Sequence, residues 1–255
     1  MKQFCFALQH LTRITLYKGA FDETAFGRAT VYFPAVGLLL AVLLILVRAV
    51  LSYIFPAPLL AAMLVAAMVV MTGGLHLDGF MDTVDGVFSG RPREKKLEIM
   101  RDSRVGAFGA LAMVCLLLLK YNIFLSLSDT LTWQAIIPAL VLSRWAMVYA
   151  IARFPYARPS GLGTLYKKYT GGRELLLATA STLIITGLVS GIAGLLLLPI
   201  AWAWVRFTGG KLTAELGGLT GDTYGATAEM TELLVYLAVF PLYGYWPGLF
   251  YSLRF

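Results

Sequence analysis

The sequence is short of charged residues and of cysteine. Asp, Glu, Lys and Arg make up only 14% of its 255 residues, against about 25% in an ordinary soluble domain. That is too few charges to coat a soluble globule. The two cysteines, Cys5 and Cys115, are far apart and belong to no CxxC or Cys/His pattern. Neither a disulfide framework nor a zinc site is therefore indicated.

Apolar residues are abundant and occur in long stretches. They make up 59% of the chain, and many stretches approach or exceed the roughly 20 residues that a membrane-spanning helix requires. We expect an all-α, polytopic membrane protein with one catalytic domain over residues 1–255. It would be a bundle of about seven transmembrane helices, within a range of five to seven. The predicted spans are 31–55, 58–77, 106–127, 134–152, a pair within 175–205, and 226–250.

The stretch 175–205 decides the predicted number of spans. It is too long for one ordinary helix, and Ser190, Gly191 and Gly194 near its middle allow a turn. With a split here, most of the 21 Lys and Arg residues fall in four segments, 1–30, 78–105, 153–174 and 206–225. The positive-inside rule makes these segments cytoplasmic. One tilted helix is the alternative.

The N-terminal segment 1–30 contains a helical pattern of apolar residues. Phe4, Ala7, Leu8 and Leu11 recur at helical spacing. They predict a short amphipathic helix, which lies either at the membrane surface or against the protein itself. The net charge of +7 follows from cytoplasmic basic residues and does not indicate nucleic-acid binding.

Three carboxylates follow the second predicted span. Asp78, Asp82 and Asp85 are spaced i, i+4 and i+7, so on a helix they share one face. At the end of an apolar span such a face is costly unless a cation compensates it, and oxygen ligands suit Mg²⁺ or Mn²⁺. Nearby Gly73 and Gly74 permit close approach of a ligand. We predict a magnesium site completed by substrate phosphate. The alternative is a solvated helix end.

Three further groups of residues are candidates. Arg101 and Arg104 flank Asp102 just before a predicted span, where guanidinium groups bind phosphate well, although both can be positive-inside anchors. His76 is either a substrate ligand or a structural histidine.

Gly221, Asp222 and Thr223 form part of a glycine-rich turn at the start of the last span. Such a turn can cradle phosphate or position a nucleophile. Alternatively, or in addition, Asp222 is the N-cap of the last helix.

Glu229 and Glu232 lie one helical turn apart within the last predicted span. Ionisable groups inside a membrane are functional candidates. These two either act as further metal or base ligands or pair with Arg144 or Lys120 inside the bundle.

Taken in order, these motifs resemble those of the cobalamin synthase family, also called adenosylcobinamide-GDP ribazoletransferase. The resemblance rests on residues 72–79 (TGGLHLDG), 82–83 (DT), 85–86 (DG), 100–104 (MRDSR) and 221–223 (GDT), with 11–13 (LTR) and 33–37 (FPAVG) before them. It implies transfer of phosphocobinamide from adenosylcobinamide-GDP to α-ribazole or its 5′-phosphate, in a late step of cobalamin biosynthesis. The products are adenosylcobalamin or its 5′-phosphate and GMP, and Mg²⁺ is required.

In the resulting hypothesis, Asp78, Asp82 and Asp85 hold Mg²⁺. Asp82, Asp102 and Asp222 are catalytic. Phosphate or substrate is bound by Gly73, Gly74, His76, Arg101, Arg104, Gly221 and Thr223. The expected location is the cell inner membrane, with the active site facing the cytoplasm. A homo-oligomer and association with other corrinoid-pathway enzymes are both left open.

Two other functions are compatible with parts of the pattern. An ion-coupled transporter also places carboxylates within a helical bundle, but near the midplane, whereas these lie at predicted span ends. Another membrane alcohol phosphotransferase would also pair a DG motif with later aspartates, but at wider spacing than residues 78–86 have.

Overall fold

The computed structural model describes residues 1–251. Within them the regular structure is helical, apart from an isolated bridge between Tyr156 and Leu219. In chain order the elements are α1 (Lys2–Leu11), α2 (Glu23–Gly27), η1 (Arg28–Tyr32), α3 (Phe33–Leu51), α4 (Ala57–Thr72), α5 (Leu75–Phe88), α6 (Arg93–Ile99), α7 (Ala107–Ser126), α8 (Asp129–Arg153), α9 (Leu162–Tyr169), α10 (Gly172–Leu216), α11 (Gly221–Tyr245) and η2 (Pro247–Leu249).

Five helical segments of the described chain are long and apolar enough to cross a membrane, or six if the bent pair α4–α5 counts as one span. The five are Glu23–Leu51, α7, α8, α10 and α11. This confirms an all-helical, multi-pass architecture. The finer expectation of seven crossings stays a prediction.

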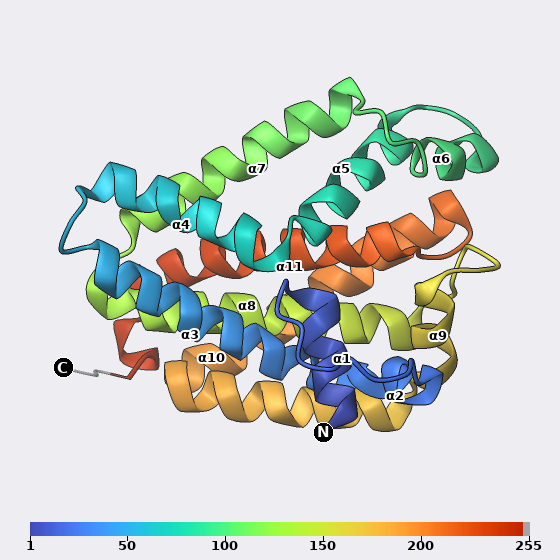
Figure 1. Ribbon diagram of the computed structural model, residues 1–255. Coiled ribbons are helices and arrows are strands. Elements are labelled where there is room, and N and C mark those ends of the chain that lie inside the picture. The colour runs from blue at the N-terminus through green and yellow to red at the C-terminus, as the bar shows by residue number, and fades with distance from the viewer. Residues whose placement is uncertain (252–255) are drawn as a thin grey trace.

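α8 is the central helix of the bundle. It packs against α3, α10 and α11, while α5 packs against α7 and α11. Its side chains from Leu131 to Ile151 are nearly all buried, because partners surround it. In Figure 1, α7 lies along the outer side of the α4–α5 pair, and α11 runs between that pair and α8.

The predicted span 58–77 is wrong as a single helix. α4 ends at Thr72, and α5 begins at Leu75 with its axis turned by 92°. Gly73 and Gly74 make this break, since both have the left-handed backbone (φ 66° and 71°) that glycine adopts without strain. The acidic residues therefore belong to a separate helix.

The chain also turns where the sequence suggested a turn within 175–205. Gly191 interrupts α10 with φ 62° and ψ −140°, a conformation that favours glycine. The two arms fold back on each other, since Gly194 lies directly against the Thr186 carbonyl and Gly187 against Leu195. In a straight helix residues 186 and 194 would be about 12 Å apart.

The N-terminal helix packs on the protein. The side chains of Phe6, Ala7, Leu8 and Leu11 on α1 are buried in the main core. This supports the second of the two alternatives for its placement. Contact with a membrane surface stays a prediction.

Three of the four basic segments contain more helix than expected. Residues 78–105 include most of α5 and all of α6, residues 153–174 include α9, and α10 continues to Leu216. Figure 1 shows α6, α9 and the α10–α11 connection at one end of the bundle, opposite the α3–α4 connection.

Candidate functional site

Two glycines let α5 approach α11 closely. A Cβ atom at Gly79 would lie 2.7 Å from the carbonyl oxygen of Asp222, and one at Gly225 would lie 3.1 Å from the Cα of His76. Side chains at these positions would force the helices apart. The close approach brings Asp82 within electrostatic range of Asp222.

The acidic residues of α5 do not all have the same environment. Asp82 also lies within electrostatic range of Asp78 and Asp85. Asp85, however, accepts hydrogen bonds from the backbone N–H groups of Gly106 (2.9 Å) and Gly109 (2.8 Å). It thereby anchors the first turn of α7, where a carboxylate also complements the helix dipole. The sequence analysis did not foresee this role.

The three predicted metal ligands do not form a complete site. Within residues 1–251, no three His, Cys, Asp or Glu side chains are grouped closely enough to hold a metal ion by themselves. The attachment of Asp85 to α7 is one physical reason. Mg²⁺ commonly uses only one or two protein carboxylates together with water and substrate phosphate. Asp78 and Asp82 provide oxygen donors of that kind.

A cavity of about 140 Å³ brings several predicted residues together. His76 and Asp78 of α5 line it together with Gly221 and Asp222 of α11. Residues of α1, α3, α8 and α9 complete its walls. The motifs around residues 76–78 and 221–222, far apart in sequence, therefore converge in space.

A larger hollow of about 610 Å³ shares Asp78 with this cavity. Gly73 and Gly74 line it, and so does Arg13, whose guanidinium lies against Gly73. The Arg13 backbone N–H also donates to the Met71 carbonyl at 3.0 Å. The sequence analysis assigned Arg13 no chemical role. Its position in the early LTR motif was the one signal that could have indicated it.

Arg158 is a second residue that the sequence analysis missed. It donates a 2.6 Å hydrogen bond to Asp222 Oδ2. In the sequence it is one of several basic residues in the segment 153–174, and no feature distinguishes it from them. The pairing fixes the Asp222 carboxylate at the cavity.

Asp222 is not the N-cap of α11, contrary to one reading of the sequence. The cap is Thr220, whose hydroxyl accepts from the Thr223 N–H. Thr223 returns a hydrogen bond by accepting from the Thr220 N–H at 2.7 Å. Thr223 is fully buried, so the structure gives it a part in the cap, and its predicted substrate contact is untested.

The motif at 101–104 lies beside the site rather than in it. Arg104 is ion-paired with Asp102, and its hydrogen bonds lower the pKa of Asp102 to about 2. These two residues are absent from the lining of both hollows among the described residues. Arg101 lies within electrostatic range of Tyr156, which also interacts with Asp222. Their predicted phosphate contacts stay predictions.

Glu229 and Glu232 pair inside the bundle. Lys120 of α7 donates to Glu229 (2.6 Å) and to Glu232 (2.8 Å), and Arg144 of α8 donates to Glu232 (3.1 Å). All four side chains are buried. The two positive and two negative charges balance. This favours pairing inside the bundle over a role for Glu229 and Glu232 as further metal or base ligands.

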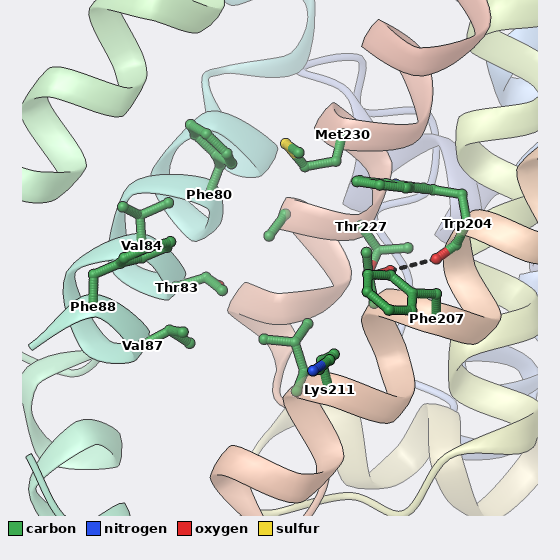
Figure 2. A pocket seen from close by; sticks show the side chains of 13 residues that line it. Phe80, Thr83, Val84, Val87, Phe88, Trp204, Phe207, Lys211, Thr227 and Met230 are labelled. Carbon is green, nitrogen blue, oxygen red and sulfur yellow. Dashed lines mark hydrogen bonds between the residues drawn. The ribbon is translucent and has the colours of Figure 1, made fainter. Parts of the chain in front are cut away.

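Another hollow, of about 270 Å³, lies between α5, α10 and α11. Figure 2 shows Phe80, Val84 and Phe88 of α5 on one side of it, with Trp204 and Phe207 of α10 on the other. Among the described residues that line it, Lys211 alone is charged. One face of α5 is therefore apolar and lines this hollow, and the acidic side chains of α5 lie on its other faces. Lys211 is thus the one ionisable side chain among the described residues that line this hollow.

Comparisons with known proteins agree with the motifs. A model of the family described as cobalamin-5-phosphate synthase matches residues 3–240. An adenosylcobinamide-GDP ribazoletransferase of Roseiflexus sp. (strain RS-1) is 43% identical over 214 residues, which cover 84% of this chain and 79% of that protein. One of the same name from Desulfitobacterium hafniense (strain Y51) is 39% identical over 253 residues, covering 95% and 98%. No solved structure matches.

Proposed function

Because the chain belongs to the cobalamin-5-phosphate synthase family, we propose that it transfers the phosphocobinamide group of adenosylcobinamide-GDP to α-ribazole or its 5′-phosphate. The reaction yields adenosylcobalamin or its 5′-phosphate and GMP. The naming of near-full-length relatives as adenosylcobinamide-GDP ribazoletransferases carries the proposal. The convergence of Asp78 and Asp222 at one cavity supports it from the structure.

The metal-binding part of the proposal rests on the donor set. Asp78 and Asp82 supply carboxylate oxygens from one helix. This chemistry suits Mg²⁺ completed by substrate phosphate. When bound, Mg²⁺ would neutralise diphosphate oxygens and stabilise the leaving phosphate group.

In the proposed step, a ribose hydroxyl oxygen of the acceptor attacks the phosphorus nearer cobinamide. The new P–O bond forms as the bond to the GMP oxygen breaks, in line with the attack. Asp222 takes the hydroxyl proton, with Arg158 holding its carboxylate in place. Arg13 and Arg101 are available for phosphate oxygens, because guanidinium groups bind them with two parallel hydrogen bonds.

Asp222 suits the role of base better than Asp102 does. A general base works best when its pKa is near the operating pH, and the pKa of Asp102 is held at about 2 by Arg104. Arg104 donates to both carboxylate oxygens of Asp102, which lies outside the cavity. Arg158 donates to Oδ2 of Asp222, which lines the cavity.

We further propose a multi-pass protein of the cell inner membrane with its site facing the cytoplasm. The basic segments that contain α6, α9 and the α10–α11 connection lie at one end of the bundle. Lys and Arg accumulate on the cytoplasmic side of membrane proteins. That side also offers access to anionic, water-soluble substrates.

The function is tested with the purified protein in lipid nanodiscs. GMP release should require the GDP-linked donor, an α-ribazole acceptor and Mg²⁺ together. A folded protein that releases no GMP under these conditions contradicts the proposal. Solute flux through the same protein in liposomes, without transfer, would instead favour the transporter.

A further inference from the structure

The 140 Å³ cavity has an interior that phosphate chemistry does not explain. Asp78 is exposed and Asp222 is half-buried, whereas Phe33, Met147 and Ile151 form buried apolar walls. The exposed rim consists of Leu75, Asp78, Leu162 and Gly221. The cavity is therefore apolar in its depth and acidic near its mouth.

Three buried polar side chains also line this interior. His76 is 2% exposed, and Tyr166 and Tyr224 are 3% exposed. Within the described chain, both ring nitrogens of His76 and both tyrosine hydroxyls have no hydrogen-bond partner. Burying polar atoms without partners is costly. Their presence around one cavity indicates a ligand that brings at least one polar atom to these groups.

The walls are held rigidly by aromatic packing. The Tyr166 ring stacks on Phe26 at 4.6 Å between centroids and meets His10 edge-on at 5.2 Å. The Tyr224 ring stacks on Tyr156 at 6.1 Å. A cavity with such fixed walls is pre-organised for a flat ring system, which lowers the entropic cost of binding.

We propose that this cavity binds the aromatic base of the acceptor nucleoside, the dimethylbenzimidazole of α-ribazole. The inference rests on the proposed function and names a subsite within it. A cavity of roughly 150 Å³ holds a benzene-sized ring, so this one takes the apolar end of a small flat base that enters past the exposed rim, and it excludes a corrin macrocycle. The ribose then extends past the rim, where Asp222 and Asp78 meet its hydroxyls.

The guanine base of the donor is the competing occupant, and the chemistry of the walls argues against it. Guanine carries an amide, an amino group and ring nitrogens along its edges, and each needs a partner when buried. The apolar walls Phe33, Met147 and Ile151 offer no such partners. A benzimidazole base bonded to ribose presents one free ring nitrogen, which His76 can satisfy by donating, and is otherwise apolar.

The test enlarges the cavity and changes the acceptor. Ile151→Ala removes buried wall atoms, and Ile137→Ala makes the same change at a buried position of α8 that does not line the cavity. The ratio of kcat/KM for a naphthimidazole riboside to that for α-ribazole should rise about tenfold or more in Ile151→Ala, since pocket fit discriminates on this scale. The ratio should be unchanged in Ile137→Ala, and the KM for the GDP-linked donor should stay within twofold in both.

A binding measurement separates this subsite from the transferase activity. Calorimetry on the wild-type protein in nanodiscs, with α-ribazole or GMP as the only ligand, needs no turnover. Tyr166→Phe and His76→Gln should weaken α-ribazole binding several-fold and leave GMP binding unchanged. If transfer occurs but these variants weaken GMP binding instead, guanine occupies the cavity and the proposal is overturned. If α-ribazole binds as described and no transfer occurs, the subsite stands and the proposed function fails.

Discussion

Gly79 of α5 lies directly against the backbone of Asp222 at the start of α11, with room for no side chain between them. The two segments that carry the candidate site meet at this contact. Their spacing is therefore set by the absence of a Cβ atom at one position.

Gly79→Ala should reduce kcat by about a hundredfold, because a displacement near 1 Å can cost that much. Alanine is a better helix former than glycine by about 1 kcal/mol, so weaker helicity would not explain the loss. Gly244→Ala is the matched control, since nothing lies within 4 Å of a Cβ there. GMP release in nanodiscs measures both. Full activity of Gly79→Ala would mean that this contact does not position the site.

Asp82→Asn should abolish turnover while the protein remains inserted and folded. The change removes a negative charge from the carboxylates proposed to hold Mg²⁺, without changing the side-chain shape. Asp129→Asn is a suitable control, because Asp129 is exposed and pairs with Arg48. Activity is measured over a series of Mg²⁺ concentrations after treatment with a chelator. Near-normal turnover by Asp82→Asn would contradict the metal assignment.

Asp85→Asn should behave differently from Asp82→Asn. Asp85 accepts from the backbone N–H groups of Gly106 and Gly109 through its two carboxylate oxygens. Asparagine keeps only one acceptor oxygen, so one hydrogen bond worth about 1 kcal/mol is lost. We expect a lower thermal unfolding temperature together with measurable activity at low temperature. If the variant is as stable as the wild type but completely inactive, Asp85 is a metal ligand after all.

The acidic pattern illustrates how far the sequence could predict the site. Helical periodicity correctly placed Asp78, Asp82 and Asp85 on one helix. It could not show that Asp85 turns towards α7, because that depends on where a distant helix begins. The pairing of Arg158 with Asp222 was not predictable either. Several basic residues lie in the same segment, and the sequence does not show which of them reaches Asp222.

In the fold, too, features set by nearby residues were more predictable than contacts between distant ones. The turn at Gly191 was predictable, because small residues interrupt a stretch too long for one helix. The break at Gly73 and Gly74 was missed, since the apolar run continues across it and hydropathy does not record φ. The close packing of α5 on α11 required the three-dimensional structure.

The roles of Asp222 and Asp102 can be separated by substitution. Asp222→Asn should lower kcat by about 10²-fold or more, the range expected for a lost general base. Asp102→Asn should have a much smaller effect, because Asp102 is already ionised and engaged by Arg104. The measurement is the pH dependence of kcat/KM for both variants. If the fall of kcat/KM at low pH disappears in Asp102→Asn, Asp102 is the base instead.

The buried charges of Lys120, Glu229, Glu232 and Arg144 give the last prediction. Lys120→Met leaves two carboxylates beside a single guanidinium, and removing one partner of a buried ion pair costs about 3–5 kcal/mol. The double variant Lys120→Met/Glu229→Gln restores charge balance, since Arg144 still pairs with Glu232, so it should recover much of the lost stability. Unfolding in mixed micelles measures both variants. If the double variant is less stable than Lys120→Met, then Glu229 contributes through contacts other than this pair. A transporter that depended on these charges would also lose flux in the double variant, whereas a transferase should keep its GMP release once stability returns.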